Sequence, residues 1–236
     1  MKIKTVLFDL DGTLLPMDLS AFTRAYLGAI VRRLAGYGYE PKKLSDAILA
    51  GTYSIVKNDG AESNERVFWN KMVEIYGQAI LSDMPRFEEF YIEEFDTLKS
   101  VCGYDPKAAI TVRKIKEMGL RVALATNPLF PSIATEKRLS WTGLSPDEFE
   151  CLTSYENSRF AKPSLNYYLD LIKKLNVDPE NTLMVGNDVD EDMVASRIGM
   201  QVFLLTDNII NRSESDVSQF PRGGYDELLD FIKTNI

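Results

Sequence analysis

Two aspartates, Asp9 and Asp11, stand two residues apart directly after a short apolar run at 5–8. Side chains alternate along a strand, so residues 9 and 11 would point to the same side. Two converging carboxylates are costly unless a cation joins them or one is protonated. Gly12 and Thr13 follow and permit a tight turn. The pattern indicates either acid–base or metal chemistry, or simply an acidic strand end followed by a turn.

Three further groups of polar residues lie at matching positions in the pattern. Thr126 and Asn127 close the second apolar run, and Lys162 begins a helical segment. The segment 186–188 closes another apolar run, and the acid cluster 190–192 comes just after it. In an open α/β sheet the carboxyl ends of the strands lie on one edge, where ligands bind. We therefore expect these groups to meet there. The alternatives are a helix cap at Thr126, a solvated Lys162 and dipole-favoured acids at a helix start.

The order of apolar and helical segments predicts the architecture. Buried strands are expected at 5–8, 120–125, 182–185 and 201–205, with a weaker one at 149–152. The segments 105–118 and 162–175 carry the start signals of helices, the first ending at a glycine. Apolar runs alternating with helices are typical of a doubly wound parallel sheet of the α/β class, a Rossmann-type core.

One long stretch departs from this alternation. Between 17 and 98 only helical periodicity is present, over 18–34, 41–57, 62–76 and 85–98. We therefore predict an α/β core made of 1–16 and 99–236, with an inserted all-helical cap at 17–98. Lys57 and Arg24 in the cap could face the site, although solvated surface positions are the simpler interpretation. The cap aromatics are expected to pack a small helical bundle.

Composition excludes several classes of chemistry. The 236 residues contain no histidine, which removes Ser-His-Asp and Cys-His nucleophiles and imidazole metal sites. A net charge of −8 argues against a nucleic-acid partner. The sequence has no apolar run of 18 residues, so no membrane-spanning helix is expected. The charged Asp9 comes too early for the apolar core of a secretory signal. The two cysteines, Cys102 and Cys151, suit a reducing compartment, so we expect a cytoplasmic protein, either a monomer or a weak homodimer.

The ordered set of motifs resembles the haloacid dehalogenase superfamily of aspartate-nucleophile phosphatases. The segment 9–14, Asp-Leu-Asp-Gly-Thr-Leu, is similar to its first motif, Thr126 to its second, Lys162 to its third and 186–192 to its fourth. The resemblance covers the whole α/β core, and the insertion after the first motif is similar to the family's helical cap of the first type.

The resemblance implies a role for each of these residues. Asp9 would be the nucleophile that becomes an aspartyl phosphate, and Asp11 the acid and then the base. Thr126 and Asn127 would hold phosphate oxygens, and Lys162 would bridge Asp9 and the phosphate. The cofactor would be Mg²⁺, which prefers oxygen ligands. The substrate would be a small phosphorylated metabolite.

The fourth motif departs from the family pattern and leaves the metal ligands open. It reads Gly186-Asn187-Asp188 where Gly-Asp is usual. The resemblance implies that Asp9, the backbone carbonyl of Asp11 and a residue of the fourth motif would bind the metal. We favour Asp188 for that residue, because an anion holds Mg²⁺ better than a neutral amide, with Asn187 as the alternative. Asp192 would pair with Lys162 or contact the metal ligands without binding the metal itself. Thr13 would likewise contact the metal ligands.

Asp11 also bears on the choice among reactions. It disfavours a dehalogenase, because a halide leaving group needs no acid. A sugar-phosphate mutase keeps this acid and stays an alternative, as does a non-catalytic phosphate-binding or regulatory module.

Overall fold

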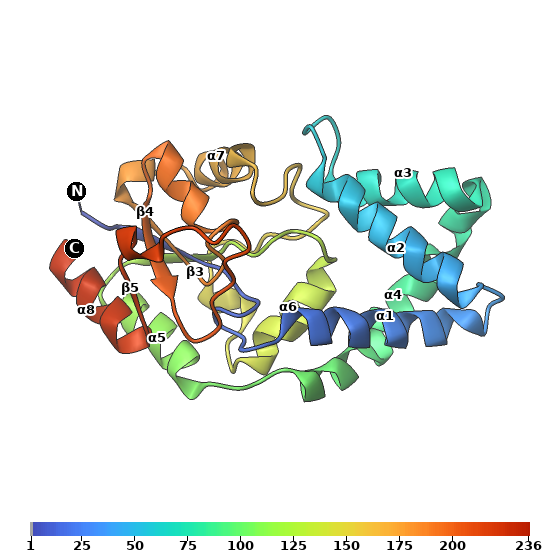
Figure 1. Ribbon diagram of the computed structural model, residues 1–236, viewed down its shortest axis with the longest axis horizontal. Helices are drawn as coiled ribbons and strands as arrows, with labels where there is room; N and C mark the ends of the chain where they lie inside the picture. The colour runs from blue at the N-terminus through green and yellow to red at the C-terminus, as the bar shows by residue number, and fades with distance from the viewer. Residues whose placement is uncertain (1) are drawn as a thin grey trace.

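The computed structural model describes residues 2–236, and a five-stranded parallel sheet lies in the half of the molecule opposite the helices α1 to α4, within 19–93 (Figure 1). The strands are β1 (Thr5–Phe8), β2 (Arg121–Leu124), β3 (Thr182–Gly186), β4 (Gln201–Leu205) and β5 (Arg222–Gly223), in the order β2-β1-β3-β4-β5. Phe8, the last residue of β1, pairs with Leu124 of β2 and Val185 of β3, so the carboxyl ends of these three strands are level. The predicted α/β class and parallel sheet are confirmed.

The weaker strand expected at 149–152 is wrong as a strand. The segment runs along the free edge of β2, where the Leu124 N–H donates to Cys151 and the Glu150 N–H donates to Val122. It forms only an isolated bridge, between Leu124 and Leu152. β5 was not predicted, because two residues, Arg222 and Gly223, carry no apolar period.

Helices cover both faces of the sheet. Residues of α5 (Pro106–Glu117) and α8 (Tyr225–Asn235) join Val6 and Phe8 of β1 in one apolar cluster. Residues of α7 (Leu165–Leu175) and η5 (Met193–Ile198) join Leu7 in a second cluster. Neighbouring residues of β1 therefore serve opposite faces, as the alternation of side chains along a strand requires.

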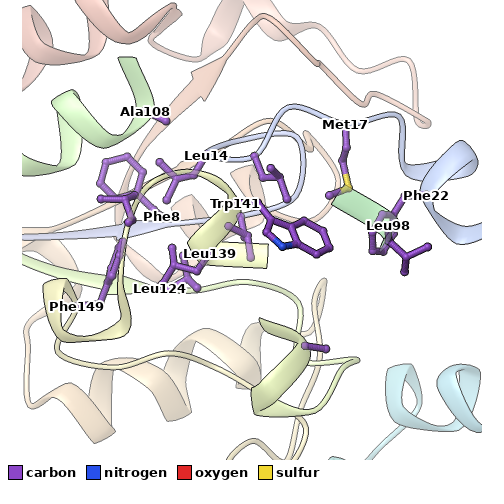
Figure 2. Packing of buried hydrophobic residues seen from close by; sticks show 14 of the residues in the cluster. Phe8, Leu14, Met17, Phe22, Leu98, Ala108, Leu124, Leu139, Trp141 and Phe149 are labelled. Atoms are coloured by element: carbon purple, nitrogen blue, oxygen red, sulfur yellow. The ribbon is translucent and has the colours of Figure 1, made fainter. Parts of the chain in front are cut away.

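The first apolar cluster continues from the sheet into the helical insertion (Figure 2). Phe8 and Leu14 lie at its core end, Trp141 of α6 (Ser132–Trp141) lies between, and Phe22 lies at its other end. One buried apolar cluster therefore joins the insertion to the sheet.

The inserted helices match the predicted pattern in most places. They are α1 (Leu19–Ala35), α2 (Pro41–Val56), α3 (Asn64–Tyr76), η1 (Gln78–Asp83), α4 (Met84–Glu93) and η2 (Phe95–Val101). Asp18 caps α1 by accepting from the Ala21 N–H. The single helix predicted at 85–98 is wrong, because α4 ends at Glu93 and η2 continues as a 3-10 helix. Within residues 2–236, no helix combines the length and the apolar character needed to cross a bilayer.

We propose that the cap is a separate domain, as the sequence predicts. The two crossings between core and insertion lie side by side: the Gly103 N–H donates to the Pro16 carbonyl at 2.7 Å, and Met17 forms an antiparallel bridge with Cys102. The predicted boundary at 98/99 falls inside η2. Asn64, at the start of α3, is fully buried and donates to the core carbonyls of Pro128 and Phe160.

Candidate active site

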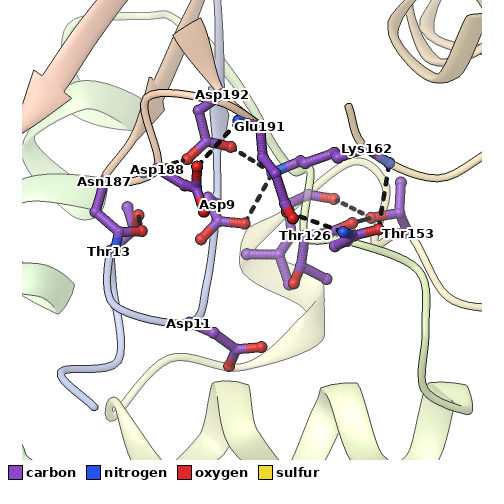
Figure 3. A network of polar contacts seen from close by, with 12 residues as sticks. Asp9, Asp11, Thr13, Thr126, Thr153, Lys162, Asn187, Asp188, Glu191 and Asp192 are labelled. Carbon is purple, nitrogen blue, oxygen red and sulfur yellow. Dashed lines mark hydrogen bonds and ion pairs between the residues drawn. The ribbon is translucent and has the colours of Figure 1, made fainter. Parts of the chain in front are cut away.

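A buried lysine joins two carboxylates at the carboxyl edge of the sheet (Figure 3). The Lys162 Nζ lies 2.8 Å from the Asp9 Oδ1 and 2.6 Å from the Asp192 Oδ1. Asp9 is held at the end of β1 by its backbone N–H, which donates to the Val185 carbonyl of β3. The predicted meeting of Asp9, Lys162 and Asp192 is therefore present.

Lys162 differs in its local structure from the prediction. It lies in a loop, because α7 begins only at Leu165, and its side chain is 1% exposed. The interpretation of a solvated residue in the first helical turn is wrong. Burial lowers the pKa of Lys162, but the carboxylates of Asp192 and Asp9 outweigh burial and hold the pKa well above its usual range. The ammonium therefore stays charged between them.

Asp11 lies apart from this lysine and has a cation of its own. The Arg138 guanidinium, on α6 and 1% exposed, donates to the Asp11 Oδ2, while the Asp11 Oδ1 is buried with no hydrogen-bond partner among residues 2–236. Burial raises the pKa of Asp11, and the positive charge of Arg138 opposes that rise. The Phe130 ring covers the guanidinium at 4.5 Å from its centroid. The two aspartates thus occupy different electrostatic environments.

The fourth motif presents its two candidate metal ligands differently. Asn187 accepts from the Thr13 hydroxyl at 3.0 Å and donates to the Asn208 carbonyl at 2.6 Å. Asp188 is 6% exposed, and its Oδ2 accepts from the Arg212 guanidinium at 2.7 Å. The Asp188 Oδ1 accepts two backbone N–H groups of its own loop. Asn187 is tied to the turn after β1, whereas Asp188 is held by a guanidinium that is half exposed.

Thr126 and Asn127 follow β2 and lie at the same edge of the sheet as Asp9 and Lys162. The Thr126 backbone carbonyl accepts from the hydroxyls of Thr153 and Tyr167 at 2.7 and 3.0 Å. The Asn127 amide donates to Glu191 at 2.9 Å and accepts from the Lys162 N–H at 3.2 Å. These contacts fix the loop after β2 against the loop that carries Lys162.

One cavity of about 90 Å³ gathers most of the predicted residues. It is lined by Asp9, Asp11, Thr126, Asn127, Asn187, Asp188, Glu191 and Asp192, and by Leu19, Leu129, Phe130 and Ile210. Thr13 reaches it through its bond to Asn187, and Lys162 through Asp9 and Asp192. The two cap candidates, Arg24 and Lys57, are exposed and are not among the described residues that line it.

The donor set of this cavity is compatible with Mg²⁺. Its polar lining consists of carboxylate, amide and hydroxyl groups, the oxygen-bearing side chains that this ion prefers. Among residues 2–236, no three carboxylate or thiol side chains converge into a cation site. A metal here would therefore be held by a small number of carboxylates together with backbone oxygen. The unpartnered Oδ1 belongs to Asp11, which lines the same cavity.

Sequence reasoning missed Arg138 and Arg212. Arg138 stands on α6, a helix that was not predicted, four residues after the buried Ala134 and three before Trp141. That spacing on the buried face is the only signal that could have marked it. Arg212 lies in the loop after β4, where no pattern distinguishes it from a solvated residue.

Comparisons with known proteins give matches over most of the chain. The model of the haloacid dehalogenase-like hydrolase family matches residues 3–198. The chain is 26% identical to a glyceraldehyde 3-phosphate phosphatase from Methanocaldococcus jannaschii, over 98% of this chain and 97% of that protein. It is 23% identical to the pyrophosphatase PpaX from Oceanobacillus iheyensis, over 85% of this chain and 82% of that protein.

A crystal structure of a predicted phosphoglycolate phosphatase from Haemophilus somnus superposes with a TM-score of 0.60. It is 20% identical, and the match covers 98% of each chain. At that identity the superposition shows that the two chains share a fold.

Proposed function

The chain belongs to the haloacid dehalogenase-like hydrolase family, and from that premise we propose that it is a Mg²⁺-dependent phosphatase acting on a small phosphorylated metabolite. The observation that carries the proposal is the contact of the buried Lys162 ammonium with Asp9 at 2.8 Å. A carboxylate that attacks a phosphate monoester must overcome the repulsion between two anions. A fixed, dry cation beside it reduces that repulsion and orients the attack.

The first half-reaction transfers the phosphoryl group to Asp9. The Asp9 carboxylate oxygen forms a bond to phosphorus, and the bond between phosphorus and the ester oxygen breaks. Asp11, protonated, gives its proton to the departing alkoxide. Burial favours the protonated form of Asp11, since it raises the pKa of this carboxyl. Thr126 and the Asn127 backbone hold phosphate oxygens.

The second half-reaction removes the phosphoryl group with water. Asp11, now ionised, accepts a proton from the water as the water oxygen bonds to phosphorus. The bond from phosphorus to Asp9 breaks, which releases inorganic phosphate and restores the carboxylate. Arg138 stabilises the ionised form of Asp11 between the two steps, so the pair can alternate between acid and base.

Mg²⁺ would be held by Asp9, the backbone carbonyl of Asp11 and Asp188. When bound, it supplies positive charge to the phosphate oxygens and to Asp9. We favour Asp188 over Asn187 because Asn187 already bridges Thr13 and Asn208. Asp188 would be available once Arg212 moves off its Oδ2. Asp192 would hold Lys162 in place, and Thr13 would orient Asn187.

The test is phosphate release from a panel of phosphorylated metabolites, with and without Mg²⁺. The proposal predicts release that chelation abolishes and that Asp9→Asn lacks, while circular dichroism shows Asp9→Asn to be folded. A purified protein that releases no phosphate from any ester with Mg²⁺ supplied would contradict it and favour the non-catalytic alternative. Transfer of phosphate to a second sugar position, without release, would instead favour the mutase.

A further inference from the structure

A second, larger cavity lies between the cap and the core. Its volume is about 410 Å³, and it is bounded by α1, α2, α3 and α4 and by residues 129–133, which run from the loop after β2 into the start of α6. Its walls are mainly aromatic and aliphatic, with Tyr26, Phe68, Trp69 and Phe87 among them. The hydroxyls of Tyr26 and Tyr91, which also line the cavity, form a hydrogen bond to each other at 2.7 Å. The polar groups of these two side chains are therefore satisfied by each other.

The two cavities adjoin. Leu19, Leu129 and Phe130 line both of them. The smaller cavity, about 90 Å³, is below the roughly 150 Å³ that holds benzene, so a phosphoryl group leaves little room there for the rest of a substrate. The larger cavity, which lies past these three side chains, offers room for a group esterified to that phosphate.

The charges of the larger cavity select against a second anion. Three carboxylates line it, from Glu65, Glu88 and Glu156, and no lysine or arginine does so among residues 2–236. The carboxylates of Glu156 and Glu88 add to burial in raising the pKa of Glu65. A leaving group that carries a phosphate or carboxylate would be repelled from this space.

We infer that the substrate is a phosphate monoester of an uncharged apolar alcohol, with an aromatic or branched aliphatic body that fills the larger cavity. The inference rests on the proposed function and narrows its substrate class. It also separates this chain from the two relatives described above, whose names specify glyceraldehyde 3-phosphate and pyrophosphate. Neither compound has an apolar body to bury.

The test compares phosphate esters of primary alcohols, which leave with similar ease. With Mg²⁺, kcat/KM should be at least about tenfold higher for 2-phenylethyl phosphate than for ethyl phosphate, because the ring leaves water for an apolar site. It should be lower for 2-carboxyethyl phosphate than for ethyl phosphate. A preference for ethyl or 2-carboxyethyl phosphate would overturn the inference and leave the proposed function standing. No hydrolysis of any ester would remove both.

A cavity-filling variant ties the preference to this space. Thr23 lines the cavity, and within residues 2–236 its hydroxyl bonds only to the Leu19 carbonyl of its own helix. Thr23→Phe should lower kcat/KM for 2-phenylethyl phosphate about tenfold and leave ethyl phosphate within twofold. Thr97→Phe is the matched control, since Thr97 is exposed in η2 and bonds likewise to its own segment, at the Glu94 carbonyl. Equal losses for both esters in Thr23→Phe would contradict the inference.

Binding without turnover gives a second readout. Trp69 lines the cavity and is one of two tryptophans in the chain. In the Asp9→Asn variant, 2-phenylethyl phosphate should change the tryptophan fluorescence at saturation, and ethyl phosphate should not. The change should disappear in Trp69→Phe. A response of equal size to both esters would count against occupation of the cavity.

Discussion

Arg138 and Asp11 are 127 positions apart in the sequence, and the guanidinium of the first donates to the carboxylate of the second. The arginine side chain is 1% exposed, and its Nε also donates to the Ala134 carbonyl of its own helix at 3.2 Å. A buried, fixed cation thus accompanies the carboxyl group to which we assign both acid and base roles.

We expect Arg138→Met to lower kcat by about 10²-fold or more, because a misplaced Asp11 loses general acid–base catalysis. KM should change much less, since Arg138 does not line the phosphate cavity. The decisive comparison is the Asp11→Asn background, where Arg138→Met should cost no further activity. Independent, multiplying losses in the double variant would show that Arg138 does not act through Asp11.

Lys162→Met should lower the free energy of unfolding by about 3–5 kcal/mol, the usual cost of removing one partner of a buried ion pair. The loss arises because Asp9 and Asp192 are left close together and uncompensated. Urea denaturation measures it. Adding Asp192→Asn to Lys162→Met should recover part of the stability but no activity. If the single variant is as stable as the wild type, the ammonium does not hold these carboxylates.

Gly12→Ala tests the packing of the turn against the fourth motif. Gly12 has φ +86°, and a Cβ there would lie 2.3 Å from the Asn187 Nδ2. Gly199→Ala is a matched control, with φ +88° in the left-handed region and no atom within 4 Å of the added Cβ. Both variants should lose about 1–2 kcal/mol from the left-handed backbone. Gly12→Ala should lose more stability than the control. It should also bind Mg²⁺ more weakly, so that its activity needs a higher Mg²⁺ concentration. Equal losses of stability would show that Asn187 moves freely.

An ion pair on the surface of the α/β part should make the free energy of unfolding depend on pH. Arg113 donates to the Glu148 carboxylate at 2.7 and 3.2 Å and lowers the pKa of Glu148. A lowered pKa in the folded state adds stability that is present above the unfolded pKa, about 4.3, and is lost as pH falls through the folded value. Glu148→Gln should cost up to about 1 kcal/mol at neutral pH, since Arg113 is half exposed.

The check on Glu148 is urea denaturation of wild type and variant across the acid range. The difference between them should shrink as pH falls below about 4.3. A difference that stays constant through this range would mean that the Arg113 contact does not depend on the charge of Glu148.

The sequence alone predicts the sheet well, because β1, β2, β3 and β4 are apolar on both faces and predicted helical segments precede β2 and β3. It also places Asp9, Thr126 and Asp188 at one edge, since parallel strands end there together. The burial of Lys162 is not predictable in this way. Its neighbours indicate a helix start, and only the folded loop brings it to Asp9 and Asp192.

Arg138 shows a different limit. Its partner is distant in sequence, and its helix carries only weak apolar periodicity, so nothing local separates a buried arginine from a solvated one. The larger cavity could not be predicted from the sequence for a similar reason. Its aromatic residues were expected to pack a helical bundle, and many do, but helical spacing cannot reveal that Tyr26, Phe68 and Trp69 leave space between them.

The central claim, that Asp9 carries the phosphoryl group, is tested most directly by acid-quenching the enzyme during turnover and mapping the modified peptide by mass spectrometry. We predict a phosphoryl group on Asp9 in the wild type, with more of it in Asp11→Asn if loss of the base slows its removal by water. Asp9→Asn should carry none. Demonstrated phosphate release with no phosphorylated Asp9 at any quench time, or with the label on another residue, would contradict the account.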